Sequence, residues 1–153
     1  MSSNVLTMPA TETTWIQGLP APTSSQPAPA RRILLVDDEE SIRQLGVETL
    51  NPSGYRVDTA ADGETGWEML CATDHGLGRY DLLITDNNMP RLSGFELIKR
   101  VRLARMVLPV IMASGMAPTA PINVEWLQLS AVLPKPFYPS QLLQAVRAVL
   151  NEV

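Results

Sequence analysis

The sequence has a single cysteine, no long hydrophobic run and no basic, apolar leader at its N-terminus. One cysteine cannot form an internal disulfide, and the place of Cys71 in an apolar helical pattern predicts an inert, buried thiol. No apolar run is long enough to span a bilayer, and residues 1–30 lack the features of a signal peptide. These absences predict a cytoplasmic protein that does not contact the membrane.

Positive charge is also scarce. Twelve Lys and Arg side chains face 16 Asp and Glu side chains, which gives a net charge of −4 and a pI near 4.9. This balance argues against nucleic acid as a direct partner.

The first apolar segment is followed by Asp37, Asp38, Glu39 and Glu40 and not by a glycine-rich turn. A nucleotide-binding α/β domain would need such a turn, and four acidic residues would repel phosphate unless a metal were present.

Residues 1–30 differ from the rest of the chain. They hold five of the 13 prolines, many Ser, Thr and Ala residues, and one charged side chain, Glu12. This composition predicts a disordered tail, whereas residues 31–153 have the length and apolar content of one folded domain. Within the tail, Trp15, Ile16 and Leu19 form an apolar cluster. It is either a docking motif or, in the interpretation we favour, part of a non-binding linker.

Short apolar runs alternate with helical patterns along residues 31–153. The predicted strands cover residues 33–36, 55–60, 82–84, 108–113 and 131–133, and the predicted helices cover 39–50, 62–71, 93–105, a short segment around Trp126, and 139–150. Five such repeats predict a parallel sheet with right-handed crossovers and helices on both faces. The second strand alternates in polarity and belongs nearer an edge. We assign Trp126 to the core, with a partner-anchoring role as the alternative.

Polar residues follow four of these strands. Because the carboxyl ends of parallel strands share one edge, the topology predicts that five side chains meet there: Asp37, Asp38, Asp86, Ser114 and Lys135. Carboxylates about 4 Å apart repel by roughly 4 kcal/mol per pair at an effective dielectric of about 20, so they need a cation. Oxygen ligands suit Mg²⁺. We interpret Glu39 and Glu40 mainly as helix-capping residues.

The central position of Asp86 favours it as a nucleophile toward phosphorus. Lys135 would neutralise a phosphoryl oxygen, and the Ser114 hydroxyl would donate a hydrogen bond to another.

Five segments in order, LLVDDEES, LLITDNNMP, SGFELI, VIMAS and LPKPF, make the chain from Arg32 to Leu150 resemble a response-regulator receiver domain of two-component signalling. The resemblance implies a flavodoxin-like (βα)5 fold, a doubly wound parallel sheet with strand order 2-1-3-4-5. It also implies a role for each site residue. Asp86 would accept phosphate from a phosphohistidine. Asp38 would ligate Mg²⁺, Asp37 would hold the ion through water, and the backbone carbonyl of Asn88 would be a further ligand. Ser114 would be the switch hydroxyl, and Lys135 would sense phosphate beside a cis bond to Pro136.

The implied partners are a sensor histidine kinase or a His-phosphotransfer protein, together with a downstream protein target; a homodimer is also compatible. Such a domain is not an enzyme beyond its own phosphorylation and dephosphorylation. Since little sequence follows Leu150, we expect output by protein contact or by a phosphorelay step. Val132 stands where the family often has an aromatic switch residue, so a rotating ring cannot report phosphorylation here.

Three alternatives stay open. One is the nucleotide-binding domain, and another is a haloacid-dehalogenase-type phosphatase, which wants a D-x-D pattern after its first strand and cap segments that this sequence lacks. The third is a receiver-like module that binds proteins without phosphorylation.

Overall fold

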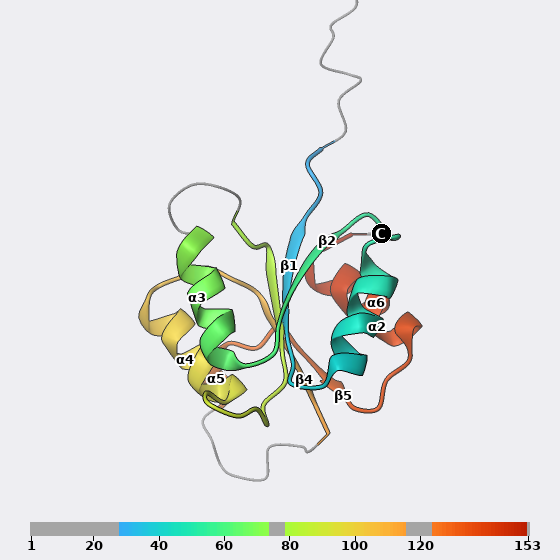
Figure 1. Cartoon of the computed structure of the whole chain (residues 1–153). Helices are drawn as coiled ribbons and strands as arrows, with labels where there is room; N and C mark the ends of the chain where they lie inside the picture. Colours follow the sequence, from blue (N-terminus) through green and yellow to red (C-terminus); the bar gives the residue numbers. More distant parts are fainter. Residues whose placement is uncertain (1–27, 74–78, 116–123, 153) are drawn as a thin grey trace, which may run out of the picture.

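An all-parallel sheet lies between two layers of helices in the computed structural model, which describes residues 28–73, 79–115 and 124–152 (Figure 1). The strands are β1 (Arg32–Val36), β2 (Arg56–Ala60), β3 (Leu82–Thr85), β4 (Val110–Ser114) and β5 (Ala131–Pro134). The helices are α2 (Glu40–Leu50), α3 (Gly63–Thr73), α4 (Gly94–Leu103), α5 (Val124–Leu127) and α6 (Pro139–Val149). The strand order is β2-β1-β3-β4-β5, so the predicted fold class, order and edge position of β2 are confirmed. Residues 1–27, with the Trp15–Leu19 cluster, lie outside the described residues.

The side chains of β1 divide the core into two parts, because neighbouring residues of a strand point to opposite faces. Leu34 and Val36 pack into the cluster under α3, α4 and α5, whereas Ile33 and Leu35 pack into the cluster under α2 and α6. All four side chains are almost fully buried. This double burial is why the strand reads as an unbroken apolar run.

The prediction that Trp126 lies in the core is wrong. Trp126 is 47% exposed, and its neighbour Leu127 is the buried residue of α5, packed against the α3 and α4 side of the sheet. The side chain of Leu127 faces the sheet, and that of Trp126, about 100° away around the helix, faces outward. The Cys71 thiol is only partly buried. Among the described residues, no helix is long and apolar enough to cross a membrane.

Asp58 joins three segments near the start of β1. Its Oδ2 accepts hydrogen bonds from the Arg32 guanidinium at 2.6 Å and from the Tyr80 hydroxyl at 2.7 Å. The Arg32 guanidinium also lies 4.7 Å from the centre of the Tyr80 ring. Burial by itself would raise the pKa of Asp58, but the bonds from Tyr80 and Arg32 outweigh it and the pKa is lowered. Burial and the bond to Asp58 raise the pKa of Tyr80 to about 12.

We expect Asp58→Asn to reduce the free energy of unfolding by about 1–2 kcal/mol at pH 7, because charge-assisted hydrogen bonds are replaced by neutral ones. A lowered carboxyl pKa stabilises the fold above the unfolded pKa of about 3.9, and this contribution is lost as the pH falls through the folded pKa. The difference from the unmodified chain should therefore shrink below about pH 4. Urea unfolding between pH 3 and pH 7 measures it.

Glu68→Gln, an exposed acid on α3, is the matched control and should stay within about 0.5 kcal/mol at every pH. An Asp58→Asn deficit that is constant with pH would contradict the assignment.

Candidate functional site

The residues singled out at the strand ends lie at one edge of the sheet. Asp37 and Asp38 follow β1, Asp86 follows β3, Ser114 ends β4 and Lys135 follows β5. The backbone continues the sheet's hydrogen bonding through these positions. The N–H groups of Asp37, Asp86 and Lys135 donate to the carbonyls of Ala60 (3.1 Å), Val36 (3.0 Å) and Ser114 (3.0 Å), respectively. The site is therefore attached to the most regular part of the fold.

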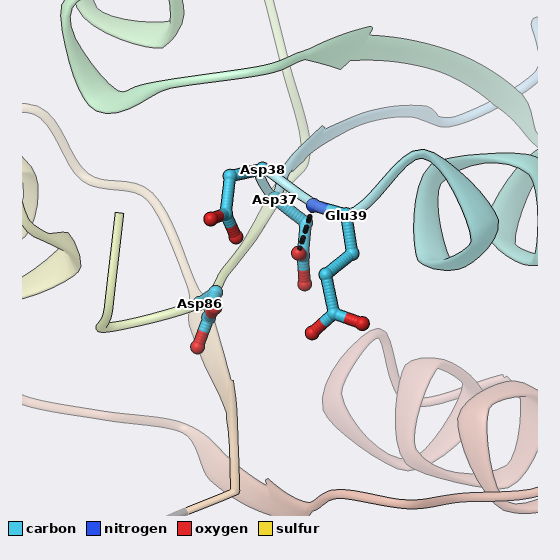
Figure 2. A group of neighbouring side chains, drawn as sticks. All are labelled: Asp37, Asp38, Glu39 and Asp86. Atoms are coloured by element: carbon cyan, nitrogen blue, oxygen red, sulfur yellow. Dashed lines mark hydrogen bonds between the residues drawn. The ribbon is translucent and has the colours of Figure 1, made fainter. Parts of the chain in front are cut away.

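Four carboxylates gather at this edge. Asp37, Asp38, Glu39 and Asp86 each offer an oxygen, and these four atoms all lie within 4.8 Å of one another (Figure 2). Asp37 and Asp86 are buried, at 1% and 5% exposure, whereas Asp38 and Glu39 are exposed. The cluster thus has a closed inner side and an open outer side that a cation or a phosphorylated molecule can approach.

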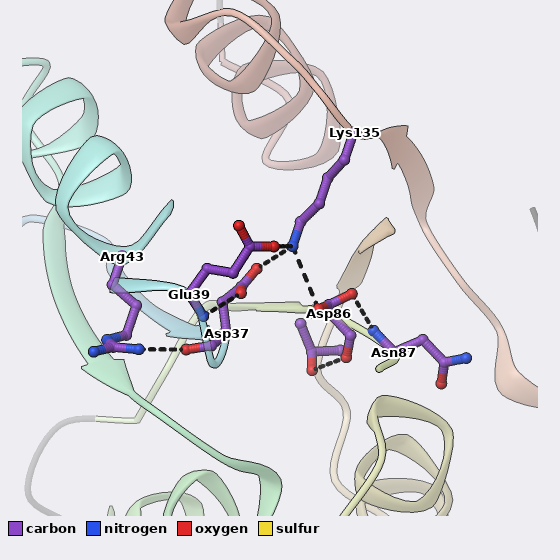
Figure 3. Close-up of polar contacts among 7 residues, drawn as sticks. Asp37, Glu39, Arg43, Asp86, Asn87 and Lys135 are labelled. Atoms are coloured by element: carbon purple, nitrogen blue, oxygen red, sulfur yellow. Dashed lines mark hydrogen bonds and ion pairs between the residues drawn. The ribbon is translucent and has the colours of Figure 1, made fainter. Parts of the chain in front are cut away.

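Lys135 is the cation that joins the cluster. Its Nζ lies 2.7 Å from Asp37 Oδ2, 3.3 Å from Asp86 Oδ2 and 3.3 Å from Glu39 Oε1 (Figure 3). Burial by itself would lower the pKa of Lys135, but the contacts with Asp37, Asp86 and Glu39 outweigh it and the pKa is raised. Burial raises the pKa of Asp37 although the Lys135 ammonium and the Glu39 N–H oppose it. The peptide bond between Lys135 and Pro136 is cis.

Glu39 has a different role from the one its sequence position suggested. It is the N-cap residue of α2, yet its side chain makes no capping hydrogen bond, and its carboxylate turns toward Lys135 instead. The capping interpretation is therefore wrong for this side chain. The sequence signal that could have placed Glu39 in the site was its position directly after Asp38, on the same loop as two candidate metal ligands.

Further hydrogen bonds fix the two buried carboxylates. Asp37 Oδ1 accepts from the Glu39 N–H at 2.9 Å, and the Asp37 carbonyl accepts from the Arg43 guanidinium at 2.8 Å (Figure 3). Asp86 Oδ1 accepts from the Asn87 N–H at 2.7 Å, which leaves Oδ2 facing Lys135. Each acid is thus held at one oxygen and directed toward the ammonium with the other.

The loop after Asp86 is held against the start of α4. The Gly94 N–H donates to the Asn87 carbonyl at 3.0 Å, and the Phe95 N–H donates to Asn87 Oδ1 at 3.2 Å. A Cβ atom at Gly94 would lie 2.1 Å from the Asp86 carbonyl oxygen, so only glycine permits this approach. Asn88, whose backbone carbonyl is the predicted ligand, is exposed on the same loop.

Ser114 and Val132 lie on the β4 and β5 side of the site. Ser114 is 7% exposed and pairs with Pro134 of β5 in the sheet. Lys135 directly follows Pro134, so Ser114 lies beside the strand end that carries Lys135. Val132 pairs with Met112 and is 52% exposed. Val132, which the resemblance predicts to stand at the position of the family's aromatic switch residue, is therefore on the surface.

This geometry can be set beside known proteins. The family model of the response regulator receiver domain matches residues 33–147. The chain belongs to the response-regulator receiver family. It is 36% identical over 118 residues to the transcriptional regulatory protein DltR of Streptococcus agalactiae, covering 76% of this chain and 50% of that protein. It is 36% identical over 123 residues to the alkaline phosphatase synthesis transcriptional regulatory protein PhoP of Bacillus subtilis, covering 79% and 49%.

Solved structures agree with this membership. The chemotaxis protein CheY4 of Vibrio cholerae is 36% identical, with a TM-score of 0.66 and coverage of 78% of this chain and 98% of that one. The response regulator TrrA of Thermotoga maritima, solved in complex with Mg²⁺-BeF, is 31% identical, with a TM-score of 0.67 and the same coverage. The chain spans about half the length of the curated relatives it matches.

Membership of the receiver family explains why acidic residues gather at this site. Receiver domains are phosphoacceptor signalling domains that bind Mg²⁺ at an acidic pocket, and response regulators receive phosphate from histidine kinases. The acidic cluster at the ends of β1 and β3 is such a pocket in its composition.

We expect Gly94→Ala to destabilise the fold by about 1–3 kcal/mol, since its Cβ must push α4 away from the Asp86 backbone. Gly115→Ala is the matched control, because a Cβ there meets no described residue closer than Lys135 Cβ at 3.9 Å. That variant should stay within about 0.5 kcal/mol of the unmodified chain. Urea unfolding followed by circular dichroism compares the two, and equal stabilities would refute the close approach at Gly94.

Proposed function

We propose that Asp86 accepts a phosphoryl group, in a Mg²⁺-dependent reaction, from the phosphohistidine of a sensor histidine kinase or a His-phosphotransfer protein. The observation that carries this proposal is the Lys135 ammonium, which lies 3.3 Å from Asp86 inside a cluster of four carboxylates at the open edge of the sheet. A nucleophile, a cation for the incoming oxygens and a set of metal ligands are thus within a few ångströms of one another.

The carboxylates fit Mg²⁺ in number and in chemistry. Four negative groups within 4.8 Å exceed what one lysine neutralises, and a hard cation takes oxygen ligands. Asp38 and Asp86 would ligate the ion directly, Asp37 would hold it through water, and the Asn88 backbone carbonyl would complete the protein's share. Bound there, Mg²⁺ supplies positive charge that offsets the repulsion between the Asp86 carboxylate and an incoming phosphoryl group.

The chain's own residues position the transfer. One oxygen of Asp86 forms a bond to phosphorus while the phosphorus–nitrogen bond of the donor breaks, and its electron pair goes to the imidazole nitrogen. The Asn87 N–H holds Asp86 Oδ1, so the carboxylate keeps a single orientation toward the donor. Lys135 neutralises one phosphoryl oxygen, and the Ser114 hydroxyl donates to another.

The added charge acts as a switch. As Lys135 and Ser114 move toward the phosphoryl group, β5 and the end of β4 shift with them, and the face that carries α5 and β5 changes shape. That face exposes Trp126 and Val132, at 47% and 52%. Exposed apolar side chains of this kind favour a downstream protein as the target. In this proposal the domain catalyses no reaction beyond its own phosphorylation and dephosphorylation.

Incubation with acetyl phosphate and Mg²⁺ should add the mass of one phosphoryl group to the intact protein. Asp86→Asn should show no gain, because the nucleophile is replaced by an amide, and a chelator should abolish the gain in the unmodified chain. Intact-mass spectrometry reads all three samples. Absence of a gain in folded, Mg²⁺-loaded protein would overturn the proposal in favour of a module that binds partners without phosphorylation.

Mg²⁺ should raise the melting temperature of the unmodified chain, because binding to the folded state alone stabilises it. Asp38→Asn should weaken Mg²⁺ binding by about tenfold or more, and the shift should need correspondingly more metal. Glu40→Gln removes an equally exposed acid two residues away that is outside the cluster, and it should bind as the unmodified chain does. Equal Mg²⁺ titrations of the two variants would remove Asp38 from the ligand set.

A further inference from the structure

A groove crosses the opposite edge of the sheet, where the strands begin. A cavity of about 220 Å³ is lined by Leu70, Tyr80, Met106, Val107 and Leu108, together with arginines. Two more hollows adjoin it, because each shares lining residues with it: Tyr80 and Val107 in one, and Met106, Val107 and Leu108 in the other. The three hollows form one continuous depression whose lining is about half polar and half apolar.

The groove has an apolar wall that no described residue covers. Val107 is 100% exposed although it follows the partly buried Met106 and precedes the buried Leu108. Val107 therefore presents one exposed apolar side chain to the groove, beside the lining residues Met106 and Leu108.

Arginines border this wall. Arg79 and Arg105 line the cavity, and neither makes an ion pair with any residue that the structure describes. Asp81 is the one carboxylate in the described lining of the groove, and the two arginines outnumber it. A groove with this excess of positive charge and with apolar side chains in its lining suits an apolar segment that carries an acidic residue.

The chain itself contains such a segment. Residues 12–19 hold Trp15, Ile16 and Leu19, and Glu12 is the one charged side chain in residues 1–30. The hollow nearest β1 is lined by Arg31, so the groove begins where the N-terminal segment joins the fold. Figure 1 shows β1 beginning at the edge of the sheet that the loop into β4 also reaches.

The connection is long enough to span the groove. The starts of β1 and β4 are separated by two strand spacings, about 10 Å, since β3 lies between them. Eleven residues, 20–30, lie between Leu19 and Arg31, which makes twelve residue-to-residue steps. At about 3.1 Å per residue for an extended proline-rich chain, they reach roughly 37 Å.

We propose that the groove favours the docking alternative over the linker interpretation: the TWIQGLP segment, residues 14–20, docks in this groove of its own domain, with Trp15 in the cavity beside Val107 and Glu12 near Arg79 and Arg105. A tethered segment faces its site at an effective concentration in the millimolar range, so a weak contact suffices to keep it bound. The disordered composition of the tail is compatible with this, because such segments order on binding.

The test uses the whole chain labelled with ¹⁵N. Amide signals of Tyr80 and Val107 should shift when Trp15, Ile16 and Leu19 are changed together to alanine. They should not shift when Val5 and Leu6, an apolar pair elsewhere in the tail, are changed to alanine. Conversely, Val107→Asp should shift the Trp15 indole N–H signal, whereas Leu103→Asp, an exposed residue outside the groove, should not.

Each alternative gives a distinct result. Groove signals that ignore the triple variant, or that respond equally to both tail variants, would overturn the proposal. Shifts that grow with protein concentration would mean that the segment binds a second copy, which would also overturn docking within one chain. Because Val107 is fully exposed, Val107→Asp leaves the core intact, and unchanged core signals in its spectrum verify this.

Discussion

The contact between the Lys135 ammonium and the buried Asp37 and Asp86 is the interaction on which the site depends. Two carboxylates at 1% and 5% exposure have lost most of their hydration, and leaving either unpaired would cost several kcal/mol. A lysine whose side chain is 11% exposed supplies the compensation and stays charged because its pKa is raised. In the proposed phosphoryl transfer the same ammonium would neutralise a phosphoryl oxygen, so one group would serve both the resting site and the reaction.

Strand order makes this contact feasible. β1 and β3 are neighbours, which brings Asp37 and Asp86 together, but β5 is two strands away from β3. The long side chain of Lys135 spans that separation, which a shorter residue would not. Hydrogen bonds from Asp37, Asp86 and Lys135 into the sheet then fix the three backbones relative to one another. The parallel sheet is therefore the frame that gives these residues their distances.

The two edges of the sheet are built differently. At the carboxyl edge the acids face solvent through Asp38 and Glu39, and their charge is only partly neutralised. Near the opposite edge, Asp58 accepts hydrogen bonds from Arg32 and Tyr80 and ties β1, β2 and the segment before β3 together. This single ion pair stabilises the domain, whereas a cluster with more carboxylates than cations can bind a further cation.

Local sequence determined the elements and the candidate residues. Unalternating apolar runs predicted the buried strands, and the residues directly after them, Asp37, Asp86 and Lys135, were selected because parallel strands share a carboxyl edge. The strand order came from the family resemblance. Periodicity and turn chemistry act over a few residues, so they suffice to predict the strands, the helices and the residues at the strand ends.

Only the tertiary structure decided the contacts between side chains that lie outside this predicted set or far apart in the sequence. Glu39 reaches Lys135 across 96 positions of sequence, Asp58 reaches Arg32 across 26, and Gly94 must be small because the Asp86 backbone lies against it. Trp126 is exposed and its neighbour Leu127 is buried, because the orientation of α5 on the sheet decides which of its side chains faces the core. Such contacts depend on how whole elements pack, and a pattern read along one segment contains no information about its distant neighbours.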